Sequence, residues 1–222
     1  MAITISGTTG VAGVDGSASA PATAGTDSNS GIYYGADVIK FSTGGTERMS
    51  ITNTGFTGIS EGKILQVVQC IKHDIWSESS VAEGAFSAVI SGFTQSFTCS
   101  ATSSKVLIQG MLHVENPVGG GWGVGAVITA DGSTITAATG NARGSNRTRL
   151  HQSMPSGYLG GPLQIQYLHS PSSTSAITYG VKLWNGHTSA QNMVLNYGSG
   201  ADSDVNNSMS TVSTLIFMEV AG

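Results

Sequence analysis

The sequence predicts an all-β protein in which a short N-terminal module precedes an antiparallel jelly-roll sandwich. Apolar residues come in short segments that alternate with polar ones, the period of a half-buried strand. The 222 residues include 31 glycines and are rich in serine and threonine, which favour turns and strands over helix interiors. Hydrophobic residues make up 39% of the chain, enough to bury a core.

The first 62 residues are expected to form the N-terminal module. Residues 1–30 carry almost no large apolar side chain, so this stretch cannot close a core by itself and needs a partner surface. Strand-like segments follow at 32–34, 38–41 and 49–51, with Gly44-Gly45 as a turn between two of them. Strands this short are marginal in water unless another chain or domain covers their apolar face.

Residues 63–222 are expected to form the jelly roll. The dipeptides Asp131-Gly132 and Asn185-Gly186 favour hairpin turns because both residue types tolerate positive φ. Eight predicted strands separated by polar turns, without a convincing amphipathic helix, are typical of a sandwich or jelly roll. These strands are residues 64–71, 86–90, 106–114, 122–129, 163–168, 177–184, 193–197 and 211–220.

The last predicted strand is apolar on both faces. Leu215, Ile216, Phe217 and Met218 follow one another, so side chains on both sides of the strand favour leaving water. One face can serve the sandwich core, and an identical subunit about a symmetry axis would cover the other. We therefore expect these four residues at the interface of a homotrimer. The alternative is a central strand covered by loops of its own chain.

Charge and hydropathy argue against two classes of partner. The chain has 9 Lys and Arg against 13 Asp and Glu, a net charge of −4, which gives no basic footprint for nucleic acid or an anionic membrane. No apolar run approaches the roughly 18 residues that span a bilayer, and the first residues lack the pattern of a secretory signal. We expect neither nucleic-acid binding nor membrane insertion, and folding in a cytoplasm.

The N-terminal module resembles a module that recurs in tail-fibre and related structural proteins of tailed bacteriophages. Four parts carry the resemblance in the same order: "GSASAPA" from Gly16, "GTDSNSGIY" from Gly25, "AD" at Ala36 with "FST" at Phe41, and "GTERM" from Gly45. Ser30 stands where threonine is commoner. The match covers residues 16–49, and the order of its parts makes it fairly specific for virion proteins.

Short strings of the C-terminal region are similar to phage appendage domains of the tumour necrosis factor or complement globular-head type. They are "ILQVVQ" from Ile64, "SATSSKVLIQ" from Ser100 and "STLIFMEV" from Ser213. The two resemblances imply a homotrimeric fibre, knob or spike, assembled in the host cytoplasm and carried on a phage particle. The module would attach to other virion proteins through Ile32, Tyr33, Phe41 and Arg48, and the head would face the host.

Two further classes of function remain open. A capsid decoration or cement protein would place the same trimer on the head lattice. A small tail enzyme that degrades polysaccharide would need paired acidic residues, and none of the 13 carboxylates forms an obvious pair.

One predicted loop concentrates cations in a chain that has few. Arg143, Arg147 and Arg149 lie within a stretch of seven residues, and guanidinium groups suit bidentate contacts with carboxylate or phosphate. The hypothesis is contact with an anionic host-surface glycan or with an acidic patch on a neighbouring virion protein. The alternative is a solvated loop.

Aromatic residues supply a second hypothesis for receptor binding. Trp122 and Tyr158, with Trp184 and Tyr197, would stack on sugar rings if they were exposed. Core packing is the alternative for each of them. Residues 119–125 are rich in glycine but lack the lysine and the following helix of a phosphate-binding loop, so a tight loop explains them better.

The sequence favours a protein that is not an enzyme and holds no cofactor or metal. Its five histidines have no ligand spacing, and neither a G-x-S-x-G elbow nor a Walker loop occurs. Residues 202–206 alternate oxygen side chains like a calcium loop but lack the expected glycine and glutamate. Cys70 and Cys99 are expected to be buried apolar residues, with a disulfide in the assembled particle as the alternative.

Overall fold

The computed structural model describes residues 4–6, 10–58, 63–115, 123–141, 144, 147–154, 160–197 and 211–222, with only the backbone of 4–6 and 10–12. The chain divides into two compact units, Met1–Lys63 and Ile64–Gly222, which we call the N-terminal module and the head. Across the described residues the single helical element is a 3-10 turn, η1 (Thr136–Ala138), so the all-β prediction is confirmed.

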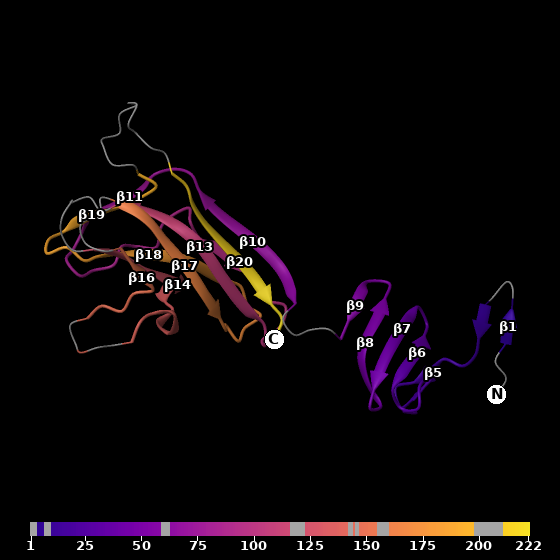
Figure 1. Ribbon diagram of the computed structural model, residues 1–222. Helices are drawn as coiled ribbons and strands as arrows, with labels where there is room; N and C mark the ends of the chain where they lie inside the picture. The colour runs from indigo at the N-terminus through magenta and orange to yellow at the C-terminus, as the bar shows by residue number, and fades with distance from the viewer. Residues whose placement is uncertain are drawn as a thin grey trace. The chain divides into compact units, whose positions relative to one another are not determined.

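The main element of the N-terminal module is a five-stranded antiparallel meander (Figure 1). Its strands follow one another in the sheet in chain order: β5 (Thr23–Ala24), β6 (Gly31–Gly35), β7 (Val38–Thr43), β8 (Thr46–Thr52) and β9 (Gly55–Thr57). Two short pairs precede it: β1 (Thr4–Ser6) with β2 (Gly10–Ala12), and β3 (Gly16–Ser17) with β4 (Ala20–Pro21).

The predicted glycine turn joins β7 and β8. Gly44 and Gly45 have φ of 58° and 75°, and the pair Thr43–Thr46 flanks them in the ladder. Positive φ at both central residues is the geometry of the two-residue turn that matches the twist of a hairpin. This prediction is confirmed.

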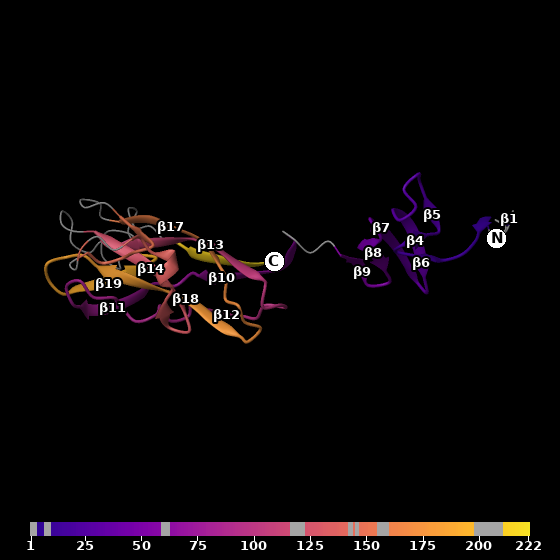
Figure 2. The same ribbon diagram turned by 90° about the horizontal axis from the view of Figure 1, so that it is seen from below.

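Two antiparallel sheets form the head, and Figure 2 shows them as two layers, with β17 and β13 in one and β18 and β12 in the other. The first sheet contains β10 (Ile64–Lys72), β11 (Trp76–Val81), β13 (Lys105–Glu115), β17 (Gly160–His169), β19 (Gln191–Leu195) and β20 (Ser213–Val220). The second contains β12 (Gln95–Phe97), β14 (Val124–Ala130), β15 (Ser133–Thr134), β16 (Gln152–Ser153) and β18 (Ile177–Asn185).

The order of the strands is that of a jelly roll. In the first sheet the last strand, β20, lies between β10 and β13, and β17 pairs with the other edge of β13. In the second sheet β18 lies between β12 and β14. The chain therefore crosses from one sheet to the other repeatedly, which confirms the predicted jelly-roll sandwich.

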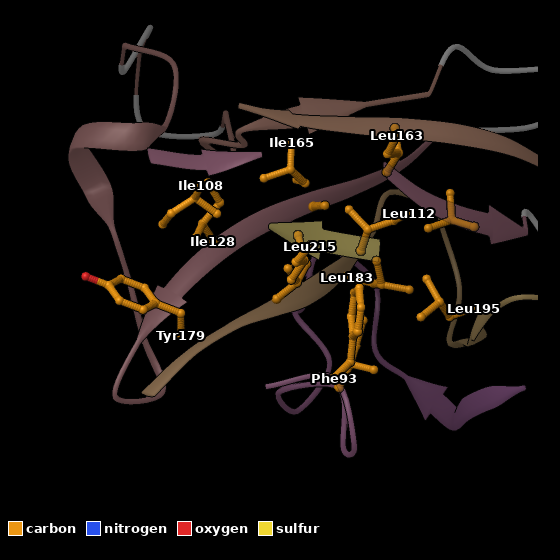
Figure 3. Close-up of a cluster of buried hydrophobic side chains, with 14 of the residues drawn as sticks. Phe93, Ile108, Leu112, Ile128, Leu163, Ile165, Tyr179, Leu183, Leu195 and Leu215 are labelled. Atoms are coloured by element: carbon orange, nitrogen blue, oxygen red, sulfur yellow. The ribbon is translucent and has the colours of Figure 1, made fainter. Parts of the chain in front are cut away.

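The core lies between the two sheets and draws side chains from both (Figure 3). Leu112 and Leu215 of the first sheet meet Leu183 of the second, and Phe93 reaches the same cluster from the segment before β12. All four side chains are at most 1% exposed. Apolar burial of this kind is the dominant favourable term in folding.

Residues 86–90 do not form the predicted strand. Phe86 makes an isolated bridge to Trp184, and the Ser87 N–H donates to the Leu183 carbonyl. The Leu183 N–H then donates to the Ser87 hydroxyl at 3.0 Å, where a ladder would offer a carbonyl. The side chain of Ser87 thus competes with the backbone and interrupts the strand.

The two dipeptides expected to form hairpin turns have different outcomes. Asp131 and Gly132 have φ of 47° and 76° and turn the chain between β14 and β15, as predicted. Asn185-Gly186 does not join a hairpin, because β18 and β19 belong to different sheets. Asn185 is buried, and its side-chain amide donates to the carbonyls of Val81, Ala82 and Ser189.

The last buried residue of β20, Glu219, is a carboxylate. Glu219 is 1% exposed, and its oxygens accept hydrogen bonds from the Ser100 N–H (2.7 Å), the Ser100 hydroxyl (2.6 Å) and the Gln66 amide (2.8 Å). Burial raises the pKa of this carboxyl, but the hydrogen bonds to its ionised form outweigh burial, so the pKa lies below its usual value.

Protonation of Glu219 is expected to destabilise the head in acid. Because its pKa is lower in the folded chain, the ionised carboxylate contributes stability above the unfolded-state pKa, and this contribution is lost as the pH falls through the folded-state pKa. Denaturant unfolding of wild type and Glu219→Gln between pH 7 and about 3 measures it. The free-energy difference between the two should shrink as the pH falls below about 4.5. A constant difference would contradict the assignment.

Candidate functional site

The four predicted interface residues of β20 alternate between the two faces of its sheet. Leu215 and Phe217 are 1% and 0% exposed and belong to the core, where the Phe217 ring lies 6.2 Å from that of Phe97. Ile216 and Met218 are half-buried and point away from the core. A neighbouring subunit cannot reach Leu215 or Phe217. The prediction of an interface is therefore wrong for these two residues, and Ile216 and Met218 remain available to a partner.

The outward side chains of the first sheet form an apolar row across four strands. The register pairs Met218 with Val67 of β10 on one side and with Leu107 of β13 on the other. Leu107 is paired in turn with Leu168 of β17. Directly opposed side chains on one face of a sheet touch, so these four make a continuous apolar stripe. Figure 1 shows the four strands side by side.

Two further rows extend this surface, which we call the outer face. The first of these rows consists of three amide side chains and one apolar side chain: Gln69, Ile216, Gln109 and Gln166. The second row consists of two apolar and two polar side chains: Ile71, Thr214, Met111 and Gln164. Val67 and Met111 are 59% and 52% exposed. The outward positions of these four strands include one charged side chain, that of Lys105 at the edge of the outer face. The residues considered are 65–71, 105–111, 164–168 and 214–220. An exposed, contiguous apolar patch of this kind marks an interaction site.

Sequence reasoning missed most of the outer face. Val67, Leu107, Met111 and Leu168 were seen only as members of predicted strands. The signal was the same one that singled out β20, apolar residues at both parities of a strand, and it is present in residues 64–71 and 106–112. What the sequence does not contain is the register that places these residues in one row.

Arg147 and Arg149 of the predicted arginine loop lie beside Thr134 of β15, which belongs to the second sheet. The Arg149 Nε donates to the Gly140 carbonyl at 2.9 Å, and its guanidinium also reaches the Thr136 carbonyl at 3.4 Å, so this side chain braces the loop. Arg147 lines a hollow of about 280 Å³ without a hydrogen bond to the described residues. The other residues lining it are Phe86, Thr134, Thr136, Thr139, Thr148 and Arg149. A ring, several hydroxyls and a cation in one hollow suit a sugar that bears a carboxylate.

Three predicted receptor-binding residues, Arg143, Trp122 and Tyr158, lie outside the described residues. Of the other aromatic candidates, Trp184 is half-buried, and its indole N–H donates to the Gly84 carbonyl at 2.9 Å. Phe86, Thr134, Thr136 and Thr139 were missed because they lie outside the segment that holds the arginines. Thr148 lies between Arg147 and Arg149 and was not singled out.

The four residues predicted to attach the module to the virion also separate in the structure. Ile32 and Phe41 are directly opposed on β6 and β7, so they share one face of the meander. Tyr33 points to the opposite face. Arg48 occupies a bulge in β8, where its Nε donates to the Thr43 hydroxyl at 2.8 Å.

Tyr33 belongs to a small polar cluster on its face. Its hydroxyl donates to Glu47 Oε2 at 2.7 Å, and Lys40 Nζ contacts the same oxygen at 3.1 Å while lying 5.6 Å from the Tyr33 ring centre. The hydrogen bond to Glu47 raises the pKa of Tyr33, and the bonds from Tyr33 and Lys40 lower the pKa of Glu47. The cluster places the charged groups of Lys40 and Glu47 on this side of the sheet.

The described residues bring together no cluster of three or more histidine, cysteine or acidic side chains able to hold a metal ion. The calcium-like segment 202–206 lies outside them. Both cysteines are free thiols, Cys99 buried and Cys70 half-buried, and burial raises the pKa of each. At neutral pH they are therefore poor nucleophiles. Among the helices of the described chain, none has the length and hydropathy to cross a bilayer.

Comparison with known proteins gives no family. No protein family matches the sequence, and no curated protein matches it. Three solved structures of infectious bursal disease virus match at low similarity. The VP2 subviral particle has 10% identity and a TM-score of 0.40, over 86% of this chain and 44% of that chain. The structure of the Gt strain has 12% identity and a TM-score of 0.40, over 83% of this chain and 48% of that chain.

The third structure, of T=1 particles derived from that virus, has 13% identity and a TM-score of 0.37, over 94% of this chain and 54% of that chain. The chain thus spans about half the length of the structures it matches. Similarity of this degree establishes neither a shared fold nor a shared function.

Proposed function

We propose that the chain is a structural protein of a bacteriophage particle, a homotrimeric fibre, knob or spike without enzymatic activity. The observation that carries the proposal is the outer face of the head, whose outward rows hold apolar and amide side chains with one charge at the margin. A protein that works alone in solution has no use for such a face. A closed cyclic assembly buries it in every copy.

The resemblance of the N-terminal module to phage tail-fibre modules supports both the virion location and the trimer. In this proposal the module anchors the protein to other virion components and the head is presented to the host surface. A cyclic axis orients all copies alike, so three modules face the particle together.

The hollow beside Arg147 is the proposed contact for an anionic host-surface glycan. It is lined by residues of the second-sheet side of the head, whereas the outer face belongs to the first sheet. Assembly through the outer face would therefore leave the hollow open. The Arg147 guanidinium would pair with a sugar carboxylate while Phe86 and the threonine hydroxyls contact the ring.

Arg147→Ala is expected to weaken binding to an acidic polysaccharide such as polygalacturonate about tenfold, the effect of losing one charge-assisted hydrogen bond of about 1.5–3 kcal/mol in partial exposure to water. Lys182→Ala, which removes a cation of β18 that does not line the hollow, is the matched control. Retention on polysaccharide beads measures both. Equal retention of Arg147→Ala and wild type would contradict the glycan contact.

Antibody labelling of purified particles tests the virion assignment. A few trimers at the tail or a vertex support the fibre, knob or spike. Hundreds of copies over the head lattice would instead support the alternative, a capsid decoration protein. Absence from purified particles would overturn the proposal. New reducing ends after incubation with host polysaccharide would show the third class, a depolymerase.

A further inference from the structure

The meander of the N-terminal module has a second apolar surface, independent of the head. The register aligns Tyr34 with Ile39, Ile39 with Ile51, and Ile51 with Phe56, so one apolar row crosses four strands from β6 to β9. A parallel row joins Ile32, Phe41 and Met49. We call these seven residues the module face.

The module face is uncovered within the described chain. Phe56, Ile39 and Tyr34 are 61%, 42% and 41% exposed, and the other four side chains are half-buried. The opposite side of the same sheet holds the three buried residues among the side chains that the structure describes in the module, Tyr33, Ser42 and Ser50. The exposed large hydrophobic side chains of the sheet therefore lie on one side and its buried residues on the other, the reverse of a solvated meander.

A single-layer sheet gains stability only when a second layer covers its apolar side. The buried hydrophobic cluster of the chain consists of head residues and includes none from the module. Seven apolar side chains on short strands cannot supply a core while one side of each remains in water. Something must cover the module face in the functional protein.

We propose that two further copies of this chain cover it, so that three meanders pack their module faces around a common axis and enclose a shared core. The seven residues of the face carry no charge, and Arg48 lies at its margin, where its Nε donates to the Thr43 hydroxyl. The charged cluster of Tyr33, Lys40 and Glu47 lies on the other side, so the apolar centres of identical faces meet without repulsion. The number of copies rests on the proposed trimer. Heads held together would present their modules to one another at an effective concentration on the order of millimolar, enough to saturate a weak contact.

This arrangement changes the roles expected within the module. Ile32 and Phe41 become part of the shared core and are not available to other virion proteins. The outward side, with Tyr33 and Glu47, remains for attachment. The contact between copies also buries an apolar surface of each meander that would otherwise favour aggregation.

A photoreactive benzoylphenylalanine placed at Phe56 in the full chain tests the inference. Position 56 lies on the module face, and the adjacent Thr57, which is paired with Ser50, lies on the opposite side and gives the matched control. Irradiation at position 56 should yield covalent dimers and trimers whose linked peptides come from β6 to β9 of another copy. Position 57 should yield at least tenfold less of these products.

Cross-links from position 56 to its own chain or to a head, or the absence of chain-to-chain products, would overturn the inference. Sedimentation of the same preparation reports the assembly of the whole chain separately. A trimer without cross-links at position 56 overturns the inference and leaves the proposed function standing, whereas a monomer overturns both.

Discussion

A chain with lysine at positions 67 and 168 is expected to sediment as a folded monomer under conditions where the wild-type chain forms a trimer. Val67 and Leu168 stand at the two ends of the apolar row and are 59% and 44% exposed in the single chain. The lysines therefore cost the folded monomer little. Buried without partners between copies, each charge opposes assembly by several kcal/mol, which weakens association on the order of a thousandfold or more.

Thr178→Lys is the control for this prediction, because Thr178 is an exposed residue of β18 in the other sheet. It adds the same charge to the head and should leave the trimer intact. Sedimentation equilibrium measures the mass, and far-ultraviolet circular dichroism verifies the fold. A trimer in the double variant would show that the outer face is not the interface.

The strands of the head were predictable from the sequence because alternation is a local property. The segments 106–114 and 177–184 fall within β13 and β18, and the turn at Asp131-Gly132 follows from two residues that tolerate positive φ. Residues 86–90 show where this reasoning fails. Their alternation is as regular, but the Ser87 hydroxyl replaces a carbonyl of the ladder.

The inward face of β20 could not be assigned from the pattern of residues alone. Glu219 has the same parity as Leu215 and Phe217, and a glutamate ordinarily marks the solvent side. In the structure this parity faces the core, because Ser100 and Gln66 supply the hydrogen bonds that the carboxylate needs. Those partners come from segments more than a hundred residues away in sequence.

The candidate surfaces depend on the same kind of distant pairing. The row from Val67 to Leu168 requires the register of four strands, and the hollow beside Arg147 requires Phe86 to lie against a loop sixty residues later. The three arginines of the loop are equivalent in the sequence. Hydrogen bonds to loop carbonyls give Arg149 a bracing role and distinguish it from Arg147.

Truncation of adjacent residues of β20 is expected to affect different properties, the stability of the fold at Phe217 and the assembly of copies at Met218. Phe217 is fully buried, with its ring 6.2 Å from Phe97 and 5.6 Å from Tyr179, so Phe217→Ala should lower the free energy of unfolding by about 3–5 kcal/mol. Met218 is half-buried in the single chain, and Met218→Ala should cost the monomer about 1 kcal/mol or less.

Denaturant unfolding in the Val67→Lys, Leu168→Lys background measures both changes without a contribution from assembly. Phe217→Leu, which leaves a smaller cavity, provides a graded loss if Phe217→Ala does not fold. In the chain that assembles, Met218→Ala should weaken association more than Phe217→Ala does, because Met218 belongs to the outer face and Phe217 does not. Equal losses of unfolding free energy at the two positions would mean that β20 does not separate core from interface.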